Sequence, residues 1–277
     1  MKKFLQLFFF CLFLATNLFG QNKRVDSLVN LLNQTQNEIE KTQFLNAIAD
    51  DYKSSNPKLM ENYARQALQL SQKIKYKAEE GNALLNLGIA QIISGNYPKA
   101  IDFFSQAKLI FENELAIGSK EELKVKSGLA RTYGSMGIVF SEQSNYAKAL
   151  QYHIKAVAIY EEIKDEEKTA RVYNNIGIVY RTQKEDFKAL DYFSRAQKLQ
   201  ERIGDGTVGI TTTNIGNLYL QQKNYEKANQ YYLEAKQLFK KYPNDRGQGE
   251  LYNNIGLYFK KTNNQPYPYI LRFEYDD

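Results

Sequence analysis

The sequence predicts an all-α protein: an α-solenoid in which similar helix–turn–helix units are stacked on one another. Three observations predict this fold. A short phrase that ends in glycine occurs five times, its copies lie about 40 residues apart, and two alanines follow four of the copies at fixed distances. The chain has 277 residues, of which 43% are hydrophobic and 13% aromatic, and this is ample apolar material for a core. Charged residues make up 25%, as in folded rather than disordered chains.

The first twenty residues have the pattern of a secretory signal peptide. Lys2 and Lys3 precede an apolar run over residues 4–15, and Gly20 then meets a polar stretch. A basic start, an apolar core of about 7–15 residues and a small boundary residue are typical of such signals. A membrane span needs about 20 apolar residues. We therefore expect residues 1–20 to be cleaved off, which leaves an exported chain without membrane contact; an uncleaved membrane anchor is the alternative.

The charge and the rare residue types argue against several classes of function. Lys and Arg number 37 against 31 Asp and Glu, and this small excess is spread along the chain, so no nucleic-acid groove is indicated. With one Cys and one His, a zinc site, a disulfide framework and a Cys–His nucleophile all lack their ligands or partners. Cys11 lies within the signal peptide. We expect no nucleic-acid partner, no metal and no cofactor.

The repeated phrase is Asn-Ile-Gly or a variant of it, and it defines the unit. Its copies are Asn86-Leu87-Gly88, Ser135-Met136-Gly137, Asn175-Ile176-Gly177, Asn214-Ile215-Gly216 and Asn254-Ile255-Gly256. The glycines are 49, 40, 39 and 40 residues apart. Turn residues such as those at 94–97 and 223–225 divide each unit, and apolar residues recur at helical spacing on both sides. Each unit is therefore predicted as helix, tight turn, helix.

Two alanines and a ring follow each of the first four glycines at constant distances. The first alanine comes twelve residues after the glycine, the second seven residues later, and a ring-bearing residue lies between them. The first alanines are Ala100, Ala149, Ala189 and Ala228, the second are Ala107, Ala156, Ala196 and Ala235, and the rings are Phe104, His153, Phe193 and Tyr232. We interpret His153 as a core residue, since it takes the place of a phenylalanine.

The recurrence of glycine has a physical explanation. Glycine inside a helix lowers the stability of the helix by about 1 kcal/mol relative to alanine. Five glycines at the same position of the repeat therefore need a structural reason that offsets this loss. We expect two helices to cross closely there, with the first alanine facing the glycine and the second packing against the next unit. A single helical hairpin cannot bury its apolar face, so the units must stack and share a core.

With this Gly–Ala–ring–Ala spacing the chain resembles the tetratricopeptide repeat (TPR) family. Four full repeats and the first helix of a fifth match, and the period of about 40 resembles the long-repeat type. A degenerate repeat fits residues 44–74, with Ala49 in the glycine place, and a helix near residues 25–34 precedes it. The resemblance implies a right-handed α-solenoid.

The expected organisation has four parts. They are a signal peptide (1–20), an N-terminal capping helix (21–40), the TPR solenoid (41–264) and an irregular C-terminal tail (265–277). About nine extra residues near 115–125 either lengthen a helix pair or form a loop.

The C-terminal tail departs from the repeat. Pro266 and Pro268 forbid a regular helix where the repeat should continue. We interpret this end as a truncated or frame-shifted copy of a longer gene, or alternatively as an unusual cap in which apolar residues between 269 and 273 fold back. An uncovered last repeat makes self-association possible.

Catalytic motifs are not supported. Residues 204–209 match G-x-G-x-x-G by letter, but a dinucleotide site needs a preceding strand, and here the glycines fall in a turn between helices. The acid pairs at 121–122 and 161–162 lie near helix ends and are interpreted as solvated faces. We expect a protein that is not an enzyme.

The candidate site is the concave groove that the first helices of TPR repeats line, as the resemblance implies. Two residues before each glycine stand Asn86, Ser135, Asn175, Asn214 and Asn254, with Asn174 and Asn253 one residue earlier. Amides both donate and accept hydrogen bonds, which suits a peptide backbone, and Arg131, Arg171 and Arg181 could pair with carboxylates. The carboxylate-clamp pattern of chaperone-binding TPR proteins is absent at these positions. Asparagines that only cap or solvate a helix are the alternative.

The sequence thus predicts an exported, periplasmic scaffold of a Gram-negative bacterium that binds a protein or peptide and has no chemistry of its own. The signal peptide and the forty-residue repeats also resemble the front half of TPR-bearing sensor kinases. The alternative function is therefore the extracytoplasmic sensor region of a truncated two-component sensor kinase or a related signal-transduction protein.

Overall fold

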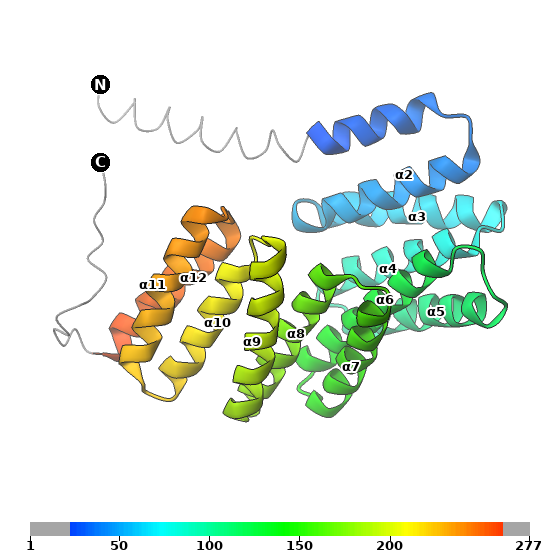
Figure 1. The fold of residues 1–277 in the computed structure, drawn as a ribbon. Helices are drawn as coiled ribbons and strands as arrows, with labels where there is room; N and C mark the ends of the chain where they lie inside the picture. The colour runs from blue at the N-terminus through cyan, green and yellow to red at the C-terminus, as the bar shows by residue number, and fades with distance from the viewer. Residues whose placement is uncertain (1–22, 263–277) are drawn as a thin grey trace, which may run out of the picture. The chain divides into compact units, whose positions relative to one another are not determined.

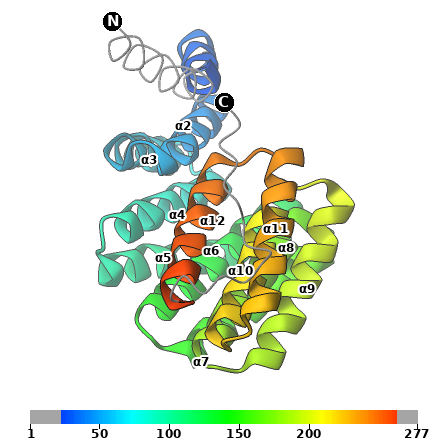
Figure 2. The same ribbon diagram turned by 90° about the vertical axis from the view of Figure 1, so that its left-hand side faces the viewer.

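The computed structural model describes residues 23–262, and every regular element in that range is helical (Figures 1 and 2). Residues 23–34 form a first helix. The following elements are α2 (Glu38–Asp51), η1 (Tyr52–Ser54), α3 (Pro57–Lys73), α4 (Lys77–Ile93), α5 (Tyr97–Ala116), α6 (Glu122–Glu142), α7 (Tyr146–Glu162), α8 (Glu166–Thr182), α9 (Asp186–Ile203), α10 (Val208–Gln221), α11 (Tyr225–Lys241) and α12 (Asp245–Lys261). The predicted signal peptide and C-terminal tail lie outside the described residues.

Short polar turns separate the helices, as the sequence predicts. The second helix of most hairpins begins at an asparagine whose side chain accepts a hydrogen bond from a backbone N–H three residues later, which satisfies a donor that the helix leaves free. These N-caps are Asn56, Asn96, Asn145 and Asn224. The residue before the cap has a positive φ in most turns, and three residues separate the two helices in these turns. Gly95 adopts it at 73° without the steric cost that a side chain brings.

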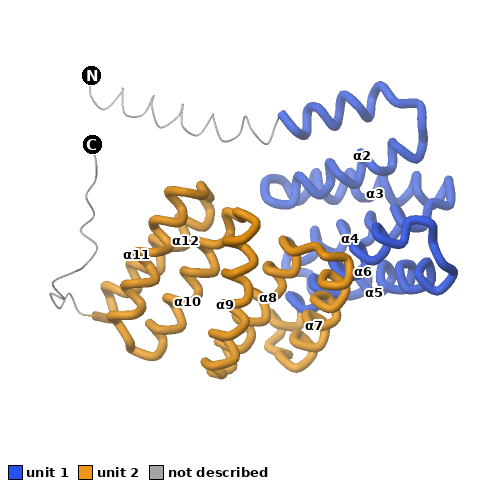
Figure 3. Tube along the Cα trace, viewed as in Figure 1, with its two compact units in different colours: residues 1–139 blue, residues 140–277 orange. Residues whose placement is uncertain are grey.

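The chain divides into two compact units, Met1–Val139 (unit 1) and Phe140–Asp277 (unit 2) (Figure 3). In unit 1, α2 packs on α3, α3 on α4 and α4 on α5, and α2 also contacts α4. In unit 2 the helices from α7 to α12 pack in the same consecutive way, and α10 contacts both α8 and α12. The predicted all-α stack of helical hairpins is confirmed.

The repeat glycines allow a ring of the second helix to touch the backbone of the first. A Cβ atom added to Gly88 would lie 2.3 Å from Phe104, and one added to Gly177 would lie 2.5 Å from Phe193. Gly216 would meet Tyr232 at 2.6 Å. The first alanine was predicted to face the glycine, and the Ala228 backbone oxygen does lie 3.4 Å from a Cβ added to Gly216. The nearest atoms to each of these three glycines, however, belong to the ring, which the prediction did not place there.

A second set of glycines, outside the repeated phrase, contacts another ring in two of the repeats. Phe111 lies between Gly81 of its own repeat and Gly128 of the following helix α6, whose added Cβ atoms would approach the ring to 2.7 and 2.5 Å. Phe239 is held in the same way between Gly209 and Gly247, at 2.6 and 2.7 Å. Each ring therefore joins two successive repeats. The equivalent positions in the other two repeats hold Tyr160 and Gln200, both buried.

Other packing predictions are confirmed. Ala67, in the second alanine place of the first repeat, packs with Ala83 of the next first helix, α4. His153 is 1% exposed in the ring position of α7. The extra residues near 115–125 lengthen both neighbouring helices, since α5 has 20 residues and α6 has 21.

The G-x-G-x-x-G match is a turn. Gly204 ends α9 in the left-handed conformation, at φ 68°, and α10 begins at Val208. Within residues 23–262, no helix is both long and apolar enough to cross a membrane.

Candidate functional site

The first helices of the repeats carry all the residues that the sequence analysis selected for a groove. In unit 1 these helices are α2, α4 and α6, and in unit 2 they are α8, α10 and α12. We call the surface formed by α8, α10 and α12 the first-helix face of unit 2. In each unit some of the selected side chains form a polar network.

The network of unit 1 is centred on Asn86. The Asn86 side chain is 2% exposed, and its Nδ2 donates hydrogen bonds to the Asn46 backbone oxygen at 3.1 Å and to Asn46 Oδ1 at 3.4 Å. Its Oδ1 accepts a hydrogen bond from Arg131 Nη2 at 3.4 Å. Asn86 was predicted to face a ligand, but both ends of its amide form hydrogen bonds with residues of neighbouring repeats.

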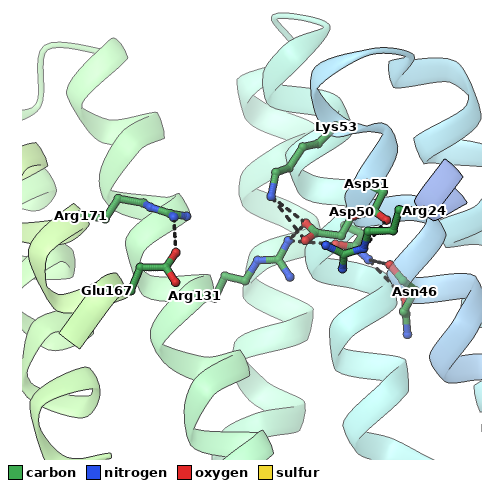
Figure 4. A network of polar contacts seen from close by, with 9 residues as sticks. Arg24, Asn46, Asp50, Asp51, Lys53, Arg131, Glu167 and Arg171 are labelled. Carbon is green, nitrogen blue, oxygen red and sulfur yellow. Dashed lines mark hydrogen bonds and ion pairs between the residues drawn. The ribbon is translucent and has the colours of Figure 1, made fainter. Parts of the chain in front are cut away.

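Arg131 has a carboxylate partner within the unit. It forms an ion pair with Asp50 of α2, and Lys53 Nζ lies 3.4 Å from the same carboxylate (Figure 4). Burial alone would raise the pKa of Asp50, but the charges of Arg131 and Lys53 outweigh it and lower that pKa. The arginine is therefore neutralised by the protein itself.

The other end of this network is also fully paired. Asn46 Nδ2 donates to Glu79 Oε2 at 2.5 Å, and Lys124 Nζ forms an ion pair with the same carboxylate, also at 2.5 Å. Glu79 is 3% exposed. Burial alone would lower the pKa of Lys124, but its contacts with Glu79 and Tyr76 raise it. The charges along this network of unit 1 thus have partners of opposite sign.

The network of unit 2 uses the same register with different charges. Asn214 Nδ2 donates to Asn174 Oδ1 at 3.1 Å, and Arg181 Nη1 donates to Asn214 Oδ1 at 3.3 Å. These three predicted residues are thus brought together on α8 and α10. Among residues 23–262, no carboxylate pairs with Arg181. Burial lowers the pKa of Arg181, because the charged guanidinium loses water without gaining an anion.

The remaining predicted residues are not part of either network. Asn175 is partly buried and Asn253 is exposed, and neither side chain has a hydrogen bond within the described part of the chain. Asn254 Nδ2 donates to the Glu250 backbone oxygen of its own helix at 2.9 Å. Arg171 forms an exposed ion pair with Glu167 at 2.7 Å, four residues earlier (Figure 4). Ser135, which takes the asparagine place in α6, is buried.

The networks follow a register that the sequence analysis did not identify. In both units the asparagine three residues before one glycine place bonds to the asparagine two residues before the next. The pairs are Asn46 with Asn86 and Asn174 with Asn214, each separated by 40 residues. Asn46 and Asp50 were missed because they lie in the degenerate first repeat, where no glycine marks the phase.

His153, Glu121 and Glu161 are side chains of types that can take part in catalysis. Burial lowers the pKa of His153 to about 4, and its Nδ1 has no hydrogen-bond partner among the described residues. Glu121 accepts a hydrogen bond from the Tyr76 hydroxyl at 2.7 Å, and Glu161 accepts one from Tyr173. These two acids are therefore not merely solvated, as the sequence analysis expected. The described residues contain no cluster of three or more His, Cys, Asp or Glu that could hold a metal ion.

Comparison with known families agrees with the repeat. Two models described as tetratricopeptide repeat match the chain, one over residues 128–202 and the other over residues 213–242. No curated protein sequence matches the chain significantly.

Solved structures share the fold at low sequence identity. The BtubC protein from P. vanneervenii matches with a TM-score of 0.61 and 18% identity, over 81% of this chain and 90% of that one. A Rap protein complexed with competence and sporulation factor gives 0.62 and 16%, over 90% and 73% of the two chains. NprR in complex with its cognate peptide NprX gives 0.63 and 16%, over 88% and 68%.

Proposed function

Because this chain is a tetratricopeptide repeat protein, we propose that it binds a protein or peptide partner on the first-helix face of unit 2 and catalyses no reaction itself. The partner that fits this face presents a carboxylate to Arg181. The backbone of the partner lies against the amides of the first helices.

The single observation that carries this proposal is the unpaired guanidinium of Arg181. A partly buried arginine without a carboxylate is costly, and its charge is best satisfied by an anion from outside. Arginine also holds a carboxylate with two parallel hydrogen bonds, which fixes the orientation of the bound group. Asn214 keeps the guanidinium in place through the bond at 3.3 Å.

The free amides supply the second part of the recognition. Asn175 lies on α8 next to the network residue Asn174, and Asn253 lies exposed on α12. An amide with neither its donor nor its acceptor in use can bond to both groups of a peptide unit. Asn86 is not included, because its amide is buried. Two of the structures that share the fold were solved with a competence and sporulation factor or a cognate peptide bound, which supports a peptide as ligand.

Binding can be tested with an array of short peptides of varied sequence probed with the labelled protein. We expect peptides that contain Asp or Glu to bind, and the same peptides to lose binding when Asn or Gln replaces the acid. Arg181→Gln should weaken binding about tenfold or more, since a charged hydrogen-bonded pair is lost. The matched control is Arg65→Gln, which removes an exposed arginine of unit 1 and the same charge. Equal binding by Arg181→Gln and the wild type would contradict the proposal.

Export to the periplasm is part of the same proposal and rests on the signal pattern of residues 1–20. Fractionation of cells that express the full chain tests it. A product in the periplasmic fraction that is shorter by about 20 residues is expected, and full-length protein in the membrane fraction would favour the anchored sensor region instead.

A further inference from the structure

Unit 2 contains a cavity that lies apart from the Arg181 network. It has a volume of about 440 Å³ and is bounded by the end of α7, the first half of α8 and the last turns of α9. None of the residues that line it belongs to the network of Asn174, Asn214 and Arg181. The volume is in the range of small-molecule sites and is much larger than a bare ion requires.

Four basic and two acidic side chains line this cavity, and most of them are already paired. Arg202 forms an ion pair with Glu166 at 2.8 Å, and Arg195 forms one with Asp191, also at 2.8 Å. The remaining acid, Glu161, accepts a hydrogen bond from the Tyr173 hydroxyl. Burial and this contact with Glu161 together raise the pKa of Tyr173 to about 12, so the phenol stays protonated and acts as a donor.

The two other basic residues, Lys164 and Lys198, are not neutralised. Neither has an ion pair within the part of the chain that the structure describes, and both line the cavity. The backbone fixes Lys164 in the turn after α7, where its φ is 58° and its N–H donates to the Glu161 oxygen at 3.1 Å. Lys198 lies on α9. Both lysine side chains are exposed, and because Glu161 has no ion pair within the described residues, the cavity carries a net excess of one positive charge.

The same cavity also has an apolar wall. Leu199 and the ring of Tyr173 line it together with the lysines. A ligand that fits must bring two negative charges to the lysines and a short apolar stem to this wall. We propose that the cavity binds a small organic dicarboxylate. This site shares no residue with the network of Asn174, Asn214 and Arg181, and it does not depend on peptide binding there.

Calorimetric titration of the purified protein with glutarate tests the proposal. Glutarate carries two carboxylates on a three-carbon stem, and glutaramide has the same shape without charge. We expect glutarate to bind and glutaramide not to bind. Lys164→Gln combined with Lys198→Gln should weaken glutarate binding about tenfold or more, because both charged partners are removed. The control pair, Lys184→Gln with Lys240→Gln, removes the same charge from exposed positions outside the cavity and should leave binding unchanged.

Other outcomes would overturn the proposal. The first is that the two double variants bind glutarate with equal affinity. The second is that titration of the wild type with about 10 mM glutarate gives no heat of binding. The third is that inorganic phosphate binds to the protein and glutarate does not. Circular dichroism shows whether both double variants fold. Arg181→Gln should leave glutarate affinity unchanged, so failure of the peptide-binding proposal and failure of this one are distinguishable.

Discussion

Units 1 and 2 have asparagines at the same repeat positions, but within residues 23–262 the arginine beside them has a carboxylate partner only in unit 1. In unit 1, Arg131 reaches Asn86 and also forms an ion pair with Asp50. In unit 2, Arg181 reaches Asn214 and meets no carboxylate among the described residues. The fold is therefore common to both units, while the charge balance is not. Identical repeat geometry can serve internal packing in one place and leave a binding group unsatisfied in another.

The largest expected effect tests the geometry that the two units share. Gly88→Leu in unit 1 and Gly177→Leu in unit 2 should each lower the free energy of unfolding by about 3 kcal/mol or more, because the new side chain would overlap a buried ring. Denaturant titration measures this. Gly256→Leu is the control, since an added Cβ there meets nothing within 4 Å. Midpoints that barely move for Gly88→Leu or Gly177→Leu would show that the register is wrong.

The next largest effect is a change in the pH dependence of stability, and it concerns His153. This residue of α7 occupies the repeat position that Phe104 occupies in unit 1. Burial lowers the pKa of His153 from 6.5 to about 4, so the unfolded chain takes up a proton more readily than the folded one. Stability is therefore lost as the pH falls from about 6.5 towards 4, and is fully retained above that window.

His153→Phe should remove this loss. Relative to the wild type, the variant should gain about 2 kcal/mol in unfolding free energy between pH 8 and pH 5. Comparing the two proteins at each pH cancels the titration of the carboxylates. A constant difference across this range would mean that His153 is not buried as a neutral ring.

The smallest effect exchanges the charge balance of the two units. Asn214→Asp gives Arg181 a carboxylate and should raise the free energy of unfolding by about 1 kcal/mol while it weakens the binding of acidic peptides. The amide of Asn174 can turn to donate to the new carboxylate. Asp50→Asn is the reverse change and should cost about 1 kcal/mol, since Arg131 loses its partner. If both changes shift stability in the same direction, the contrast between Arg131 and Arg181 is not one of charge.

The sequence allowed the repeat and its period to be predicted, because glycine, alanine and ring recur within single hairpins. Gly177 and Phe193, for example, are close in sequence and meet inside one hairpin. The networks could not be predicted in the same way. The side chain of Asn86 can face either a ligand or the side chain of Asn46, and the stacking of two repeats 40 residues apart decides between them. The partner of Arg131 lies 81 residues away, in a repeat without the marker glycine.

The packing of Phe111 between Gly81 and Gly128 affects the order in which the repeats unfold. Phe111 and Phe239 each couple a repeat to its successor, so neighbouring repeats melt together at these two junctions. Gln200 takes the same place between α9 and α10, where its Nε2 donates to the Thr207 hydroxyl at 2.9 Å and its Oε1 has no partner within the described range. We therefore expect this junction to couple its two repeats less strongly than the two phenylalanine junctions do, and thermal opening of unit 2 to begin there.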